Sequence, residues 1–77
     1  MPKAFVMINV NPGTDRDVVN ELKSYSGVSK VYEVYSVYDI VVELQTDTME
    51  ELKEILNTKI RKMNNVLSTH TMIAAEK

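Results

Sequence analysis

Two hydrophobic periods along the chain predict four strands and two helices. Short apolar runs rich in β-branched and aromatic residues favour strands, as in the early segment Ala-Phe-Val-Met-Ile-Asn-Val. Apolar residues that recur every three or four positions favour amphipathic helices, and Asn-Pro-Gly, Ser-Gly and Asn-Asn interrupt the pattern between segments. The predicted strands cover residues 4–10, 28–35, 38–44 and 66–75, and the predicted helices cover residues 15–25 and 49–62.

Capping residues predict where the two helices begin and end. Thr48 followed by Glu51 forms a capping box for the second helix, and Thr14 followed by Asp17 forms a looser one for the first. Gly27 suits the left-handed conformation that ends a helix. Acidic residues early and basic residues late in the second helix agree with its dipole.

The strands differ in how their apolar residues divide between the two faces. The first strand is apolar on both faces, so we expect both to be buried. In the third strand one face is strongly apolar, with Tyr38, Ile40, Val42 and Leu44. In the second strand, alternation places Val28, Tyr32 and Val34 on one face and Val31 and Tyr35 on the other.

The order β-α-β-β-α-β predicts an α+β, ferredoxin-like fold in a single domain spanning residues 1–77. In this fold both helices cover one face of a four-stranded antiparallel sheet. The other face would carry apolar side chains, either Phe5, Met7, Val41, Leu67 and Ile73 or their alternates. Because such a patch is unfavourable in water, and because so small a chain buries only about 60% of its unfolded surface, we expect self-association through this face.

Composition excludes several classes of protein. The chain has no cysteine and one histidine, so we expect no disulfide, no metal site and no cofactor. A net charge of -2 gives no general attraction to nucleic acid, so we expect no direct nucleic-acid partner. No apolar run approaches the ~20 residues of a membrane span, and no signal-peptide pattern is present, so we expect a cytoplasmic protein with no membrane partner.

His70 and Asp39 are the polar residues that call for separate interpretation. His70 is the side chain whose ordinary pKa lies nearest neutrality, but the sequence supplies no acid or base partner for it, and we expect a surface or interface role. Asp39 follows a chain reversal, where it would either bind a ligand or accept hydrogen bonds from the backbone. The tyrosines near Lys30 do not form a nucleic-acid surface, since Glu33 and Glu43 lie in the same strands.

Several motifs occur in an order that is similar to one known family. An Ala-Phe-Val opening strand is followed by Asn-Pro-Gly before the first helix, and Val28 lies eleven residues before Asp39. Tyr38-Asp39 then leads into the apolar run from Ile40, and the last strand contains Thr69-His70-Thr71. Over nearly its whole length the chain resembles the effector-binding domain of the Lrp/AsnC transcription regulators, also called the RAM domain.

The resemblance implies a stand-alone sensor or assembly module rather than an enzyme. Full-length members carry a helix-turn-helix domain before this region, whereas here the first strand begins directly after Met1-Pro2-Lys3. Family members pair their sheets into a dimeric α/β barrel, and the dimers associate into octameric or decameric rings. The implied partners are a second copy of the chain, an amino acid or related metabolite lodged between dimers, and full-length Lrp/AsnC regulators.

The resemblance also assigns the candidate ligand-binding residues. The family's Gly-x-Tyr-Asp turn and its Thr-x-Thr motif fall on Ser36, Val37, Tyr38, Asp39, Thr69 and Thr71. In these roles Asp39 would bind an α-ammonium group, and the threonine hydroxyls and turn amides would bind an α-carboxylate. Tyr38 would form one wall of the pocket for the ligand's side chain. The family commonly has Thr-Gly where this chain has Tyr35-Ser36. Serine restricts the turn, so either the loop differs in shape or amino-acid binding is weakened.

Two alternatives use the same fold. A small dimeric α/β-barrel enzyme, similar to muconolactone isomerases or cofactor-free monooxygenases, would place His70 and Asn9 near an internal cavity. An ACT-type amino-acid sensor would bind its ligand near Pro12-Gly13 and pair edge strands side by side.

Overall fold

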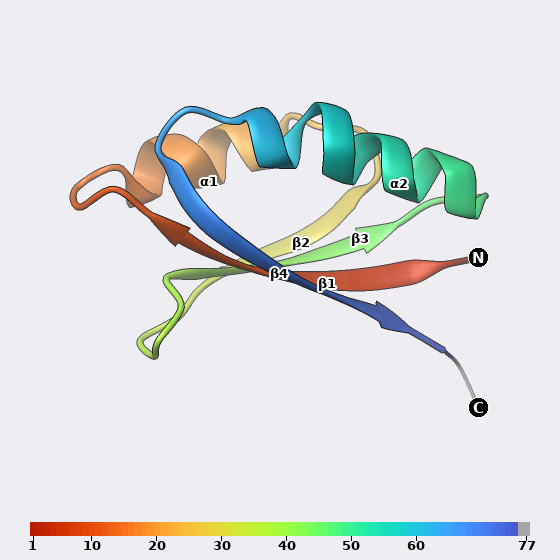
Figure 1. The fold of residues 1–77 in the computed structure, drawn as a ribbon, viewed down its shortest axis with the longest axis horizontal. Helices are drawn as coiled ribbons and strands as arrows, with labels where there is room; N and C mark the ends of the chain where they lie inside the picture. The colour runs from red at the N-terminus through yellow and green to blue at the C-terminus, as the bar shows by residue number, and fades with distance from the viewer. Residues whose placement is uncertain (76–77) are drawn as a thin grey trace.

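The computed structural model describes residues 1–75 as one antiparallel sheet with two helices lying across one of its faces (Figure 1). The elements are β1 (Lys3–Val10), α1 (Asp15–Lys23), β2 (Val28–Glu33), β3 (Ile40–Gln45), α2 (Met49–Thr58), the 3₁₀ turn η1 (Ile60–Lys62) and β4 (Val66–Ala74). This order confirms the predicted ferredoxin-like β-α-β-β-α-β fold. No helix in residues 1–75 combines the length and apolar character needed to cross a membrane.

The two middle strands are shorter than the sequence predicted. β2 ends at Glu33 instead of residue 35, and β3 begins at Ile40 instead of Tyr38. Residues 34–39 therefore form a loop, which is closed at its base by a hydrogen bond from the Val34 amide to the Asp39 carbonyl at 2.9 Å. The second helix is also shorter, since its last turn tightens into η1, as helix ends commonly do.

The hydrophobic core lies between the helices and one face of the sheet. The strands are ordered β2-β3-β1-β4, which places β1 in the interior with β3 and β4 on either side. One face of β1 is buried, but the opposite face remains partly exposed, so the prediction that both faces are buried was wrong. The core consists of Ala4, Val6, Ile8, Val10, Val18, Leu22, Ile40, Val42, Leu44, Leu52, Leu56, Ile60 and Met63.

The two predicted helix caps differ in the structure. Thr48 caps α2: its Oγ1 accepts a hydrogen bond from the Glu51 amide at 3.2 Å and donates one to the Glu51 carboxylate at 3.1 Å. This confirms Thr48 as the cap of α2, although the Glu51 carboxylate bonds the Thr48 hydroxyl and not the Thr48 amide of a full capping box. Thr14 makes no side-chain cap to α1, and its hydroxyl donates to the Asn11 carbonyl at 2.7 Å. The looser capping box at Thr14 was therefore wrong.

A β-bulge changes which residues of β2 face the helices. Val31 pairs with Val42 and Tyr32 pairs with Val41, but the register shifts between Val28 and Lys30. Both Val28 and Val31 consequently pack against the core, while Tyr32 faces away from the helices and is 49% exposed. The sequence had placed Val28 with Tyr32, which was wrong because strict alternation fails across a bulge.

The sheet face turned away from the helices is called the open face below. Cross-strand pairing places the following residues on it: Lys3, Phe5, Met7, Asn9, Lys30, Tyr32, Val41, Glu43, Gln45, Ser68, His70, Met72 and Ala74. Its centre is apolar, with Phe5, Met7 and Val41, as the sequence predicted. Ile73 lies on the helix side because it pairs with the buried Ala4, so its predicted place on the open face was wrong, and Leu67 lies at the register shift between Val66 and Ser68.

Candidate functional site

The loop of residues 34–39 is held to the end of β1 by hydrogen bonds of Asp39. Its amide donates to the Ile8 carbonyl at 3.0 Å, and its carbonyl accepts from the Val34 amide at 2.9 Å. Its carboxylate Oδ2 accepts from the Val10 amide at 2.9 Å. One oxygen of the predicted ammonium-binding carboxylate therefore serves the backbone, which was one of the two roles that the sequence left open.

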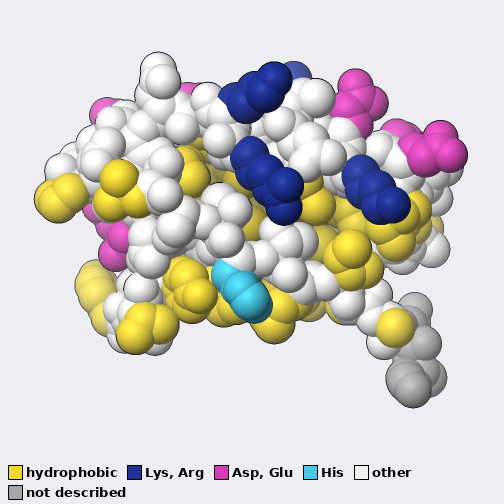
Figure 2. Space-filling view, in the orientation of Figure 1, with side chains coloured by type: hydrophobic (Ala, Val, Ile, Leu, Met, Phe, Trp, Pro, Cys, Tyr) yellow, Lys and Arg dark blue, Asp and Glu magenta, His cyan; other side chains and the backbone are white. Residues whose placement is uncertain are grey.

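Tyr38 and His70 lie together at the loop end of the open face. Their ring centroids are 6.5 Å apart and the ring planes are inclined by 33°. Tyr38 extends from the loop, while His70 extends from β4 opposite Met7. Figure 2 shows the histidine, in cyan, beside hydrophobic side chains at the edge of the molecule that lies away from the helices. Loop and strand thus meet in an aromatic pair that the sequence analysis did not identify, because it depends on the β1–β4 register.

The two predicted threonines, Thr69 and Thr71, face the helix side of the sheet, opposite to His70. Thr69 pairs with Ile8 and Thr71 with Val6, and both of those partners point into the core. Thr69 and Thr71 are therefore half-buried on the helix side of β4, whereas His70 between them lies on the open face. The side chains of Thr69-His70-Thr71 thus alternate between the two faces, as in a regular strand. Within one chain, however, the threonines and the Tyr38 ring lie on opposite sides of the sheet.

The remaining predicted residues are at the exposed tip of the loop. Ser36 is exposed, and Val37 is 79% exposed. Their neighbour Tyr35 is fully exposed, at 103% of the reference value. The structure therefore joins four of the six candidates, Ser36 to Asp39, in one continuous loop and separates them from the two threonines. Enclosure of a ligand between these two groups would need a surface from another copy.

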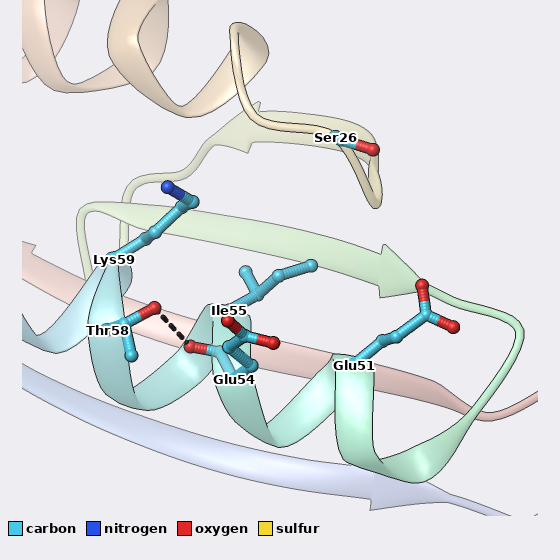
Figure 3. Close-up of a pocket in the computed structure, with 6 residues that line it drawn as sticks. All are labelled: Ser26, Glu51, Glu54, Ile55, Thr58 and Lys59. Atoms are coloured by element: carbon cyan, nitrogen blue, oxygen red, sulfur yellow. Dashed lines mark hydrogen bonds between the residues drawn. The ribbon is translucent and has the colours of Figure 1, made fainter.

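Apart from this loop, a hollow lies in the helix layer, between α2 and the turn that follows α1 (Figure 3). Its volume is about 240 Å³, and it is lined by Ser26, Glu51, Glu54, Ile55, Thr58 and Lys59. Figure 3 shows the Ser26 side chain across the gap from α2, and Thr58 donates a hydrogen bond to the Glu54 carbonyl at 2.7 Å. All of its lining residues except Ile55 are exposed, so this hollow is shallow.

Tyr25 is the residue beside this hollow whose ionisation is altered. Its hydroxyl donates to the Glu21 carboxylate, and the Lys59 Nζ lies 5.6 Å from its ring centroid. Burial, the hydrogen bond to Glu21 and the negative charge of Glu21 raise the pKa of Tyr25 to about 12. Tyr25 therefore stays protonated at physiological pH and acts as a structural link between α1 and the Lys59 side chain.

The hydrogen bonds within residues 1–75 give His70 no acid or base partner, since its described contact is the Tyr38 ring. Asn9 of the enzyme alternative donates instead to the Ser68 hydroxyl at 3.3 Å. No group of histidine, aspartate and glutamate residues in the described part of the chain is arranged to hold a metal ion. The site therefore offers aromatic surface, hydroxyl groups and one carboxylate, which suit binding of a small polar molecule.

Comparison with known proteins shows that the chain is similar to one domain of a family of transcription regulators. A sequence model of the Lrp/AsnC ligand binding domain matches residues 3–77. The HTH-type transcriptional regulator FL11 of Pyrococcus abyssi is 39% identical over 70 residues, which cover 91% of this chain and 46% of that protein. The chain thus spans about half the length of the curated relatives that it matches.

Two solved structures show how closely the fold is shared. The crystal structure of FFRP-DM1 is 37% identical and superimposes with a TM-score of 0.93, covering 97% of this chain and 100% of that one. The regulator NMB0573 of Neisseria meningitidis, solved as a complex with L-Met, is 10% identical, with a TM-score of 0.85 over 99% of this chain and 51% of that one. The likeness to NMB0573 concerns the fold alone. The match across residues 3–77 shows that this chain belongs to the Lrp/AsnC ligand-binding-domain family.

Proposed function

We propose that this chain is a non-enzymatic module of transcription regulation that assembles through its open face and binds an amino acid or related small metabolite between dimers. The observation that carries the proposal is the apolar centre of the open face, which no element of the chain covers in residues 1–75 (Figure 1). Sheet-to-sheet pairing of two copies would remove this surface from water.

The composition of the open face supports pairing with another protein surface. Phe5, Met7 and Val41 form its partly buried centre, and Lys3 and Glu43 lie toward one end with their charged groups 3.9 Å apart. An apolar centre with polar groups around it is the usual anatomy of a protein interface. Because the pairing surface is a whole sheet face, the expected product is a dimer with twofold symmetry.

The separation of the predicted ligand residues supports a site made by more than one copy. The loop of residues 34–39 and the helix-side threonines of β4 lie on opposite sides of the sheet, so one chain does not enclose a ligand with both. When dimers associate further into rings, the base of the loop of one dimer, with Tyr38 and Asp39, would meet the β4 edge of the next. The family's description as a ligand binding domain and the L-Met complex of NMB0573 favour an amino acid as the ligand.

In the proposed site, backbone amides and hydroxyl groups bind the α-carboxylate, and the free oxygen of Asp39 binds the α-ammonium group. Ser36 stands where the family commonly has glycine, and its Cβ narrows the approach of the loop to a ligand. Full-length Lrp/AsnC regulators, which share the open face, are further proposed partners, and DNA would be contacted by such partners and not by this chain.

The assembly part is tested by light scattering at increasing protein concentration. We expect the wild type to be a dimer or a larger assembly, and Met7→Asp to be a monomer that keeps its helical and sheet circular dichroism. Lys53→Glu changes the charge of an exposed residue on α2 and should leave the assembly unchanged. A wild-type protein that stays monomeric at all concentrations would contradict the proposal.

The ligand part is tested by calorimetric titration and thermal shift with the common amino acids. We expect at least one to release heat and to raise the melting temperature, because a ligand that binds the native state stabilises it. Ser36→Gly should bind the same amino acid more tightly, since glycine lets the loop backbone approach more closely. No heat and no thermal shift with any amino acid, for the wild type and for Ser36→Gly, would exclude this class of ligand.

A further inference from the structure

A hollow of about 380 Å³ opens at one end of the open face. It is lined by Met1, Lys3, Phe5, Gln45, Ala74 and Ala75. Lys3 pairs with Gln45 on one side and with Ala74 on the other, so these residues share the face that turns away from the helices. The lining combines an aromatic ring and alanine methyl groups with one ammonium and one amide group. Such a hollow suits a side chain that is apolar along its length and polar at its tip.

The opposite end of the same face carries a projection. The loop of residues 34–39 extends beyond the sheet on the side away from the helices (Figure 1). Tyr35 is fully exposed at its tip and Val37 is 79% exposed, whereas Asp39 anchors its base to Ile8 and Val10. Residues 34–38 carry no charged side chain. An uncharged, fully exposed tyrosine on an anchored loop is the kind of residue that forms the centre of a protein interface.

The tip and the hollow do not meet within one chain. The loop adjoins the Val10 end of β1, and the hollow adjoins the Lys3 end of the same strand. A strand rises about 3.3 Å per residue, so the seven steps from Lys3 to Val10 separate the two ends by roughly 23 Å. Because both features lie on the open face, only a second molecule facing that surface would bring a tyrosine to a hollow.

A twofold axis between two copies would bring the loop tip of each copy to the hollow of the other. If two copies pair their open faces with strands running in opposite directions, the loop end of each sheet lies over the hollow end of the other. Each Tyr35 then reaches the partner's hollow, and no loop and no hollow is left over, as a closed interface requires. Strands running in the same direction would instead bring the two projecting loops to the same end and leave both hollows empty.

We infer that Tyr35 of one copy is seated in the hollow at the Lys3–Gln45 end of a second copy and anchors the dimer. The ring packs against Phe5 and the alanine methyl groups, and the phenol hydroxyl bonds the Gln45 amide or the Lys3 ammonium at the polar end. This inference rests on the proposed pairing of open faces, and it adds the relative direction of the strands and the residue that holds them.

The first test measures the dimer dissociation constant by analytical ultracentrifugation. We expect Tyr35→Ser to raise this constant about 30-fold or more, as loss of an interface hot spot does. Because Tyr35 is fully exposed, this change does not disturb the core of the monomer. Ala74→Trp fills the hollow without touching the loop and should weaken the dimer to a similar extent. Met49→Ser, which removes an exposed apolar residue of α2, should leave the constant unchanged.

The second test uses the absence of native cysteine in the chain. Tyr35→Cys combined with Ala74→Cys introduces one thiol at the tip and one at the hollow, and a short bismaleimide about as long as a tyrosine side chain should link two copies. Neither single variant should form a covalent dimer, because like positions lie at opposite ends of the assembly.

The outcomes separate this inference from the proposed function. A dimer whose dissociation constant is the same with Tyr35→Ser as with the wild type overturns the Tyr35 anchor but leaves face-to-face pairing intact. Cross-linking by Tyr35→Cys alone shows that the loops meet each other and overturns the strand direction. A wild-type protein that remains monomeric overturns both the pairing and the anchor.

Discussion

The carboxylate of Asp39 accepts a hydrogen bond from the Val10 amide at 2.9 Å and thereby joins the loop of residues 34–39 to the central strand β1. The backbone of Asp39 adds bonds to Ile8 and Val34. The position of Tyr38 against His70 and the projection of Tyr35 both depend on this anchor. Its other carboxylate oxygen takes part in no hydrogen bond within residues 1–75, so one side chain has the chemistry to hold the loop and to bind a ligand.

Asp39→Asn separates these two roles. The amide carbonyl of asparagine still accepts from Val10, so the free energy of unfolding should fall by less than about 1 kcal/mol. Loss of the negative charge should weaken binding of the amino acid that the wild type binds by about tenfold or more, because charged hydrogen bonds are the stronger ones. Urea denaturation and calorimetric titration measure the two effects.

Asp39→Ala is the matched comparison. It removes the acceptor and leaves the Val10 amide without its partner, so unfolding should require about 1–3 kcal/mol less than in the wild type. Equal stability losses for the asparagine and alanine variants would show that the charge, and not the acceptor geometry, holds the loop. Full amino-acid affinity in Asp39→Asn would contradict the ligand role of this residue.

Gly27→Ala should destabilise the protein more than Gly13→Ala. Both glycines have positive φ, at +93° and +83°, which costs an alanine about 1–2 kcal/mol. A Cβ at Gly27 would also lie 2.5 Å from Ile55 Cδ1, whereas a Cβ at Gly13 meets nothing within 4 Å. Because Cδ1 is the end of the partly exposed Ile55 side chain, which can turn away, relieving this contact adds about 0.5–1.5 kcal/mol to the cost at Gly27. Chemical denaturation of the two variants measures the difference.

The double variant Gly27→Ala with Ile55→Val identifies the source of that difference. Valine lacks the Cδ1 methyl group that meets the new Cβ, so the double variant should be more stable than expected from the sum of the two single changes. Simple additivity, or equal losses at Gly13 and Gly27, would show that backbone strain alone sets the cost.

Thr48→Ala should lower the free energy of unfolding by about 1 kcal/mol, because it removes the side chain that caps α2. The Thr48 hydroxyl bonds both the Glu51 amide and the Glu51 carboxylate, and the Thr48 side chain is exposed, so little packing is lost. Thr48→Ser keeps the hydroxyl and should be close to the wild type in thermal denaturation. A serine variant as unstable as the alanine variant would assign the effect to the methyl group.

The sequence predicted those features that depend on neighbours along the chain. The Thr48–Glu51 cap and the order of elements follow from local spacing, and the structure has both. Gly27 has the predicted left-handed conformation, but α1 already ends at Lys23 with Ser24 as its cap, so the prediction that Gly27 ends the helix was wrong. Thr14 makes no cap although its spacing is similar, and its hydroxyl donates to the Asn11 carbonyl. Sequence spacing does not show whether the hydroxyl oxygen will lie within reach of an amide of the first helical turn.

The features that depend on pairing between distant strands were not predictable in the same way. The bulge between Val28 and Lys30 breaks the period of two, so the sides of β2 were assigned wrongly. The sequence assigned Tyr38 and Asp39 to the third strand, whereas they lie in the loop before it, and the contact of Tyr38 with His70 needs the register of β4 against β1. That register also puts Ile73, and not Met72, on the helix side.

Tyr25 makes stability depend on pH above neutrality. Its pKa is raised to about 12, chiefly by burial and then by the hydrogen bond and charge of Glu21, against an ordinary value of about 10 in the unfolded chain. The folded state therefore binds the phenol proton more tightly than the unfolded state. The resulting stabilisation is fully present below about pH 10 and is lost as pH rises toward about 12.

Phenylalanine cannot ionise, so the variant Tyr25→Phe does not show this loss of stability at high pH. In urea denaturation from about pH 9 to about pH 12, the stability advantage of the wild type over Tyr25→Phe should shrink steadily, while lysine titration affects both proteins alike. Glu21→Gln removes the charge but leaves the burial, so it should keep the larger part of the pH dependence. A constant difference between wild type and Tyr25→Phe across this range would mean that the phenol ionises equally readily in the folded and unfolded chains.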